Sequence, residues 1–264
     1  MAAAAKYLRI MKVSLTNAVA YRASILPRFA FYALFIYVFS NLWGAIYREG
    51  SVDGYSYAQI VWYLIMTELI VFSSQGNSIM GRINEDVRGG AIAYQLGRPV
   101  HYIMLQLAGS MGQLLLNLVS FGALAAALGL LIVGAPPALA LAGIPALLLS
   151  VALGLTIGSL FMTLIGLSSF IFEDNFAAYI IYQKICFMLG VLLPVEFLPD
   201  WLQPVAKALP FSYITWAPAK LFVAWSPGLA LELLPRQALW AAAVAAATRM
   251  CYRMAVRRLN VNGG

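Results

Sequence analysis

The sequence predicts an all-α, polytopic membrane protein with six transmembrane helices in a single domain that covers residues 1–264. Of the 264 residues, 62% are hydrophobic and only 10% are charged, whereas charged residues make up about a quarter of a soluble domain. Six separate apolar stretches also meet or nearly meet the roughly 20 residues that a helix needs to cross the hydrocarbon core. These stretches are residues 25–47, 57–75, 102–133, 139–172, 175–194 and 235–256.

Residues 1–22 predict a helix that lies in the headgroup plane. Lys6, Arg9 and Lys12 interrupt the segment, so it lacks the apolar core of a cleavable signal peptide. At about 100° per residue these basic side chains lie opposite one apolar face. That face comprises Leu8, Met11, Leu15, Ala18 and Val19.

The first span carries an aromatic residue at every fourth position: Phe31, Phe35, Phe39 and Trp43. Such stripes usually pack against lipid or neighbouring helices. A stripe that faces a translocation path would instead bind flat or cationic amphiphiles by stacking and cation–π attraction. The sequence leaves both interpretations open.

Two ionisable residues lie inside predicted spans, Glu68 in the second and Lys184 in the fifth. At about 1.5 Å per residue, both lie roughly 10–13 Å from the cytosolic ends of their helices. Because a charge in lipid is costly, their matching depth and opposite sign predict a pair in the translocation path. Snorkelling of Lys184 alone to the inner headgroups is the alternative.

The connector at 76–101 predicts an amphipathic cytosolic helix followed by a second apolar patch. Apolar side chains recur every four residues, charges of both signs occupy the other faces, and Gly89–Gly90 offers a helix stop. Such a helix suits docking into a groove on another protein, although a surface helix without a partner remains the alternative. The connector residues singled out are Ile79, Arg82, Ile83, Glu85, Asp86, Val87, Arg88, Ile92 and Tyr94.

The third and fourth spans carry patterns typical of helix–helix contact. Polar residues recur along one seam of the third span, and small residues form a stripe on the fourth. A role in lining a substrate path is the alternative for both. The seam comprises Gln106, Ser110, Gln113, Asn117 and Ser120, and the stripe comprises Ser150, Gly154, Gly158 and Gly166.

Residues 195–234 are rich in proline and aromatic side chains, which predicts short helices at the external interface. The last span, 235–256, crosses only if Arg236 snorkels outward and Arg249 inward.

The distribution of basic residues predicts that both termini are cytosolic. The net charge of +7 then reflects topology and contact with anionic membrane lipid. Because the sequence has no soluble module that carries a basic patch, the charge does not indicate nucleic-acid binding. Twelve of the 17 basic residues fall on the cytosolic side: Lys6, Arg9, Lys12, Arg22, Arg28, Arg82, Arg88, Arg98, Arg249, Arg253, Arg257 and Arg258.

The sequence offers no catalytic or metal site. Cys186 and Cys251 with the single His101 make neither a metal centre nor a favoured disulfide. There is no G-x-x-x-x-G-K-[ST] loop, so the chain cannot cradle ATP phosphates. A polytopic membrane enzyme is therefore a weak alternative. A secondary ion-coupled transporter with Glu68 as ion site is a second alternative, although no inverted repeat is apparent.

Two motifs resemble the type-2 permeases of ABC transporters. Residues 86–100 read Asp-Val-Arg-Gly-Gly-Ala-Ile-Ala-Tyr-Gln-Leu-Gly-Arg-Pro-Val, which is similar to the cytosolic connector of that family. The pattern Leu-Pro-x4-Pro-Asp-Trp-Leu from residue 193, followed by Leu-Pro-Phe at 209–211 and Pro218, is similar to its external segment. The closest resemblance is to permeases of roughly 260 residues that pair with a second permease and an ATPase.

The resemblance implies the membrane-spanning half of an ATP-driven exporter in the bacterial inner membrane. A dimer of ATP-binding subunits would grip the 76–101 connector and carry ATP and Mg²⁺, so this chain holds no cofactor. The second permease would be a different chain, with an identical copy as the alternative. Short re-entrant helices would line an external gate, with an inert external cap as the alternative. The resemblance does not select a substrate, but the aromatic first span favours an amphipathic one, such as a drug or organic cation. The gate residues would be Pro194, Phe197, Pro199, Trp201, Pro210 and Phe211.

Overall fold

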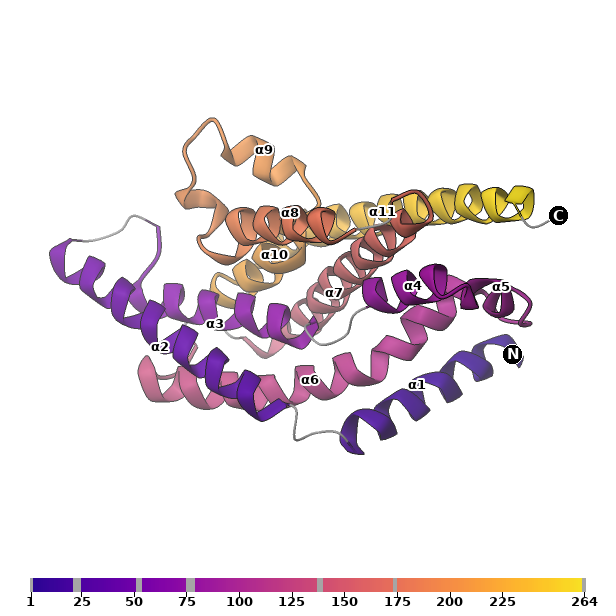
Figure 1. Ribbon diagram of the computed structural model, residues 1–264. Helices are drawn as coiled ribbons and strands as arrows, with labels where there is room; N and C mark the ends of the chain where they lie inside the picture. Colours follow the sequence, from indigo (N-terminus) through magenta and orange to yellow (C-terminus); the bar gives the residue numbers. More distant parts are fainter. Residues whose placement is uncertain are drawn as a thin grey trace.

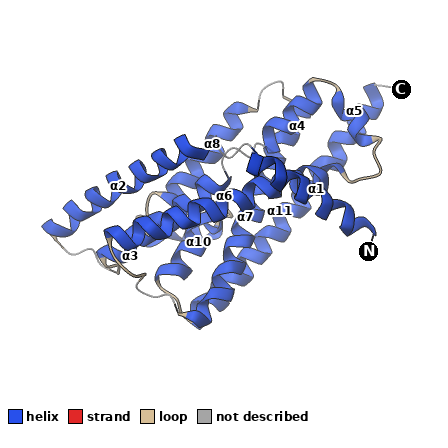
Figure 2. Cartoon of the chain, turned by 90° about the horizontal axis from the view of Figure 1, so that it is seen from below, coloured by secondary structure: helices blue, strands red, loops and turns tan. Residues whose placement is uncertain are grey.

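A computed structural model describes residues 2–20, 25–50, 54–74, 79–136, 140–172 and 175–262, and no strand occurs in these ranges (Figures 1 and 2). The prediction of an all-α polytopic membrane protein is confirmed. Five helices are long and apolar enough to cross a membrane, and they lie at Leu26–Glu49, within Tyr57–Arg88, and at Tyr102–Ile132, Leu141–Phe170 and Pro227–Arg257.

The first three helices are α1 (Ala2–Ala20), α2 (Leu26–Glu49) and α3 (Tyr57–Ser74). Helix α3 is apolar on every side and is accordingly buried on almost every side, with residues 60–68 all inaccessible. It packs against α2, α6 and α10. Helix α2 buries one stripe and leaves its other faces exposed, as a helix at the edge of a bundle does.

The connector forms two short helices, α4 (Ile79–Arg88) and α5 (Ala91–Leu96). Gly90 between them has a φ of 71°, in the left-handed region that glycine adopts without strain. The predicted helix stop at Gly89–Gly90 is thus confirmed. The first part of the predicted connector, residues 76–78, lies outside the described residues.

The middle of the chain contains α6 (Tyr102–Ile132), then η2 (Leu141–Gly143), α7 (Ile144–Leu167) and η3 (Ser168–Phe170) in one helical run. Helix α8 (Phe176–Cys186) continues into a π-helical turn, η4 (Phe187–Val191). This fifth predicted span is shorter than the other spans, and the helical run ends just before Leu193 and Pro194. Proline at 194 cannot extend the turn, because it lacks a backbone N–H.

The predicted external region contains η5 (Val195–Phe197), α9 (Gln203–Ala208) and α10 (Ser212–Val223). Helix α10 is almost wholly buried between α3 and α7, so it inserts into the bundle rather than lying on it. The last helix, α11 (Pro227–Asn262), begins eight residues before the predicted Pro235. Its start follows the local chemistry, because the Ser226 hydroxyl accepts from the Leu229 N–H and Pro227 occupies the first turn. Pro235 lies inside the helix.

The small-residue stripe of α7 confirms the prediction of helix contact. A Cβ at Gly154 would lie 2.5 Å from the carbonyl oxygen of Ile214 on α10, and one at Gly166 would lie 3.0 Å from Ile83 on α4. The Ser150 hydroxyl donates to Gln237 Oε1 on α11 at 2.7 Å. Small side chains therefore let three other helices approach the α7 backbone closely.

The polar seam of α6 also makes helix contacts. Asn117 Nδ2 donates to the Ser73 carbonyl on α3 at 3.0 Å, and Gln113 Nε2 donates to Asn117 Oδ1 at 2.8 Å. Hydrogen bonds of this kind satisfy polar groups that lipid cannot.

Helix α1 differs from the predicted interfacial helix, because part of it packs directly on α6. A Cβ at Gly112 would overlap the α1 backbone at Ser14 and Leu15, and the Ser14 hydroxyl donates to the Gly109 carbonyl at 2.6 Å. The predicted apolar face therefore divides. Ala18 is buried against the bundle, whereas the other flank remains exposed with Leu8, Leu15 and Val19.

Both termini lie at the same end of the bundle as α4 and α5 (Figures 1 and 2). The end of α2 and α9 lie toward the opposite end (Figure 1). The structure thus places the connector and the two ends of the chain on one side of the bundle.

The contact at Gly154 yields a packing prediction. Gly154→Ala should lower the free energy of unfolding by about 1–3 kcal/mol, because the added methyl group must displace the α10 backbone. Thermal unfolding in detergent measures the change. Gly122→Ala on α6 is the matched control, since nothing lies within 4 Å of its added Cβ. An equal loss in both variants would contradict close packing at Gly154.

Candidate functional site

The connector is anchored to its own subunit by the residues that were predicted to dock on a partner. Ile79, Ile83 and Ile92 are at most 2% exposed. They pack with Tyr102, Ile103 and Leu167 of α6 and α7, and Val87 lies partly buried against the same cluster, named here the connector core. The apolar side chains of the connector are therefore covered within the chain, so docking of the connector on another protein, which stays a prediction, depends on its exposed residues.

Two charged connector residues join α4 to the start of α6. Asp86 Oδ2 accepts from the Tyr102 hydroxyl at 2.7 Å and from Gln106 Nε2 at 2.9 Å. Arg82 Nε in turn donates to Gln106 Oε1 at 3.1 Å. A helix held by both a hydrophobic face and a polar network cannot rotate independently of α6 and α7.

The exposed connector surface contains the remaining predicted residues. Glu85 and Arg88 are exposed, and the Tyr94 side chain is 70% exposed. The Arg98 guanidinium lies 4.8 Å from the centre of the Tyr94 ring, a cation–π arrangement that the sequence pattern did not reveal. These four residues, Glu85, Arg88, Tyr94 and Arg98, are named the connector tip.

The aromatic stripe of α2 does not occupy one face. Steps of four residues advance about 400° around a helix, so the stripe drifts by about 40° per step. Phe31 is 66% exposed, Phe35 and Phe39 stack at 4.3 Å, and Trp43 is buried against the bundle. Phe35, Phe39 and Trp43 therefore contact the hydrophobic core of the subunit, whereas Phe31 is exposed.

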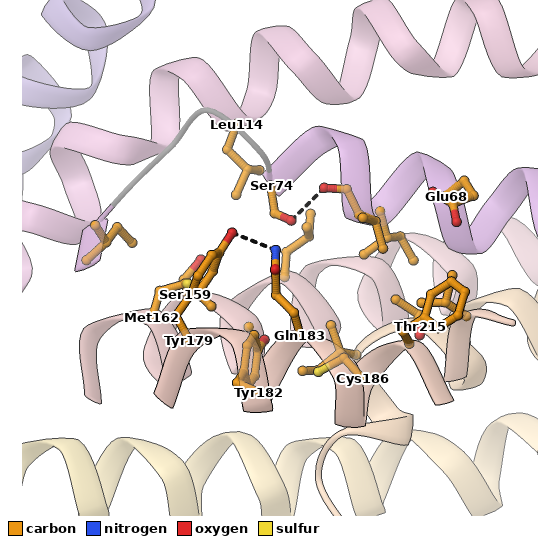
Figure 3. Close-up of a pocket in the computed structure, with 18 of the residues that line it drawn as sticks. Glu68, Ser74, Leu114, Ser159, Met162, Tyr179, Tyr182, Gln183, Cys186 and Thr215 are labelled. Atoms are coloured by element: carbon orange, nitrogen blue, oxygen red, sulfur yellow. Dashed lines mark hydrogen bonds between the residues drawn. The ribbon is translucent and has the colours of Figure 1, made fainter. Parts of the chain in front are cut away.

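A cavity of about 290 Å³ lies between α3, α7, α8 and α10 (Figure 3). Apolar side chains form much of its wall, among them Ile70, Leu155 and Met162. Figure 3 shows Glu68 and Thr215 toward one end, and Ser159, Tyr179 and Gln183 toward the other. The cavity therefore combines an apolar wall with a few polar groups from separate helices, as small-molecule sites do.

Glu68 and Lys184 both line this cavity, as their predicted depths imply. They do not form an ion pair in the described part of the chain, where the only two ion pairs are Lys220–Glu196 and Arg236–Glu232. Glu68 is 4% exposed, whereas Lys184 is exposed. The structure thus brings the two residues to one cavity without joining their charges.

A polar cluster that the sequence did not predict connects the external segment to the bundle. Glu196 on η5 forms an ion pair with Lys220 on α10, with Oε1 3.1 Å from Nζ. Glu196 Oε2 accepts from the Tyr55 hydroxyl at 3.1 Å and from Trp216 Nε1 at 3.3 Å. Lys220 also donates to the Tyr55 hydroxyl at 2.7 Å and lies over its ring. These residues, Tyr55, Glu196, Trp216 and Lys220, are named the external cluster.

The predicted gate residues separate into three places. Phe197 packs beside the external cluster, with its ring 5.3 Å from that of Tyr55 and 5.9 Å from that of Trp43. Phe211 instead lies 5.0 Å from Phe161 on α7. Pro194 and Pro210 are buried, whereas Pro199 and Trp201 are exposed before α9. The structure therefore does not bring the six residues together as one gate.

The charges in the external cluster perturb each other. Burial would raise the pKa of Glu196, but the Lys220 charge and the hydrogen bonds to the carboxylate outweigh it and hold that pKa below its ordinary value. Burial and the negative charge of Glu196 together raise the pKa of Tyr55. Glu196 is therefore ionised and Tyr55 neutral across the physiological range.

No metal centre is indicated within the described ranges, because no group of three or more His, Cys, Asp or Glu side chains gathers there. Cys186 and Cys251 are free thiols.

The external cluster yields a pH prediction. Glu196→Gln should lower the free energy of unfolding by about 1–3 kcal/mol at neutral pH, because it removes the charge that Lys220 and two donors share. Since the pKa of Glu196 is lower in the folded protein, this stabilisation is present above the unfolded value of about 4.3 and is lost as the pH falls. Thermal unfolding of both proteins between neutral and acidic pH tests this.

Glu232→Gln is the matched control for that experiment. Glu232 pairs with Arg236 one helical turn away, and about half of each side chain is exposed. Its loss should change stability by less than about 0.5 kcal/mol. If Glu196→Gln destabilises no more than this control at neutral pH, the external cluster does not hold the segment to the bundle.

The comparisons with known proteins agree with this architecture. The chain matches the family described as "ABC-2 family transporter protein" over residues 29–263, which spans α2 to the end of α11. The search of curated proteins finds no match. Because the family match covers almost the whole chain, the resemblance of its connector and external segment is confirmed. The chain belongs to the ABC-2 transporter family and is a membrane permease of an ABC transporter.

Proposed function

We propose that this permease is the membrane-spanning half of an ATP-driven exporter that moves an amphipathic substrate out of the cytoplasm. A pair of ATP-binding subunits supplies the energy and carries ATP and Mg²⁺. A second permease, most simply a different chain, completes the pathway. The protein resides in the bacterial inner membrane with both termini in the cytosol.

The anchoring of the connector is the single observation that carries this proposal. Its apolar side is fixed to α6 and α7 through Ile79, Ile83 and Ile92, and Asp86 bonds directly to Tyr102 at the start of α6. A force applied to the exposed tip is therefore transmitted to two long membrane helices. This is the mechanical arrangement that a permease without its own nucleotide site requires.

The proposed orientation rests on charge and on the arrangement of the chain. The connector and both termini lie at one end of the bundle, and the sequence concentrates basic residues in these segments. Basic residues are enriched in cytosolic segments of membrane proteins. An ATP-binding subunit in the cytosol would then meet the connector tip directly.

The proposed path runs from the cavity beside Glu68 toward the external cluster. Helix α10 links the two, because Thr215 lines the cavity and Lys220 belongs to the cluster. Phe197 packs between Trp43 and Tyr55 at the outer end. Opening of this end would require the contacts of Glu196 to change. We therefore assign the gating role to the external cluster and Phe197 rather than to Trp201, which is exposed.

Reversal of charge at the connector tip tests the coupling. Arg88→Glu combined with Tyr94→Ala should reduce co-purification of the ATP-binding subunits by about tenfold, because both side chains are exposed and neither supports the connector core. Pull-down from membranes, quantified against the permease, measures the effect. The same variant should lose substrate-stimulated ATP hydrolysis in proportion.

Arg48→Glu is the matched control, since Arg48 is an exposed arginine at the last turn of α2, toward the opposite end of the bundle. It should retain the ATP-binding subunits. Equal retention in the connector variant, with normal expression, would overturn the proposal that this tip receives the ATPase.

A further inference from the structure

We propose that the cavity between α3, α7, α8 and α10 is a binding site within one permease subunit for an amphipathic organic cation, with the Glu68 carboxylate as its counter-charge and the Thr215 hydroxyl as its acceptor. The inference deepens the proposed function, because it names a substrate class and places its site inside one subunit. It rests on groups in the cavity that have no partner of their own.

The first of these groups is the carboxylate of Glu68. The residue is 4% exposed and lines the cavity, yet no hydrogen bond or ion pair joins its carboxylate to any residue that the structure describes. The Tyr32 hydroxyl donates to the Ile65 carbonyl at 2.9 Å rather than to Glu68. An unpaired acidic group at this depth is costly, so a positive charge in the cavity would stabilise it.

The second group is the hydroxyl of Thr215. It is 1% exposed, its Oγ1 has no hydrogen-bond partner within the described residues, and it lines the same cavity. A threonine inside a helix usually bonds to the preceding turn, so an unused buried hydroxyl is a vacant donor and acceptor. Figure 3 shows Glu68 and Thr215 at the same end of the cavity. Two unused polar groups on separate helices thus lie toward the same end of the cavity.

The surroundings favour an organic cation over a metal ion. Ca²⁺ and Mg²⁺ need about six or more oxygen ligands, whereas the described residues hold no group of three or more metal-ligating side chains. The wall is instead formed by aliphatic residues, Met162, and the rings of Tyr179 and Tyr182. An aromatic or alkyl body fits the wall by burial of apolar surface, and its charge is attracted to carboxylate and ring faces. The cavity volume of about 290 Å³ lies near the lower end of the range for small-molecule sites.

Lys184 allows a test of whether the cavity prefers a positively charged ligand. It lines the cavity but is exposed and does not pair with Glu68. A positive charge at the cavity wall opposes the binding of a cation, so removing it should strengthen binding. Removing Glu68 should weaken binding, and the two substitutions therefore act in opposite directions.

Ethidium is the probe, because it is a rigid aromatic cation whose fluorescence rises when it leaves water. The full-length permease, with any subunits that co-purify, is placed in nanodiscs without nucleotide, and empty nanodiscs are subtracted. Glu68→Gln should raise the Kd at least about tenfold, and Thr215→Val should raise it about threefold. Lys184→Gln should lower it. Tetraphenylphosphonium should displace ethidium, whereas tetraphenylborate, of the same shape and opposite charge, should not.

Glu49→Gln is the matched control, since Glu49 is an exposed carboxylate at the end of α2, far from the cavity lining. It should bind ethidium as the unaltered protein does.

Absence of saturable ethidium binding to the unaltered protein, or an unchanged Kd in Glu68→Gln, overturns the proposal of this binding site. Equal weakening in Glu68→Gln and Lys184→Gln overturns the assignment of charge. If Glu68→Gln does not fold, Thr215→Val and Lys184→Gln still decide the question. Because no nucleotide is present, these outcomes are independent of whether the connector tip binds an ATPase.

Discussion

Polar groups inside a membrane protein must find partners within the protein, and the network around Gln237 meets this requirement where three helices join. Gln237 Nε2 on α11 donates to the carbonyls of Ser150 on α7 and Tyr213 on α10, and its Oε1 accepts from the Ser150 hydroxyl. Both side chains are fully buried. This network, with the close contact at Gly154, holds α10 inside the bundle. The position of α10 in turn fixes Thr215 at the cavity and Lys220 in the external cluster.

The π-helical turn η4 follows the same requirement. A π turn widens the helix and leaves a carbonyl without its usual partner. Here the Tyr63 hydroxyl on α3 donates to the Gly190 carbonyl at 2.7 Å, and the absence of a side chain at Gly190 lets Thr215 approach closely. The irregular turn is thus supported from α3 and α10 on two sides. It forms part of the cavity wall through Phe187 and Val191.

Local signals in the sequence determine much of this fold. Apolar length located α2, α3, α6 and α7, Gly89–Gly90 marked the end of α4, and the stripe of small residues on α7 predicted close helix contact. Two local errors have physical causes. The prolines at 227 and 235 both permit a helix start, and only the cap at Ser226 distinguishes them. The drift of a four-residue repeat separated Phe31 from Trp43.

The candidate sites depend on contacts between residues far apart in the chain, which periodicity cannot reveal. Tyr55, Glu196 and Lys220 meet only after α10 has inserted, so no local pattern connects them. The connector illustrates a subtler limit, because amphipathic spacing shows that Ile79 and Ile83 are buried but not by what. They are covered by α6 and α7 of the same chain. The connector of a single subunit therefore exposes a mainly polar tip with one prominent tyrosine, and the apolar side chains of its described residues are largely covered. Such a subunit can complete its folding before assembly begins, without exposing a surface that invites aggregation or capture by chaperones.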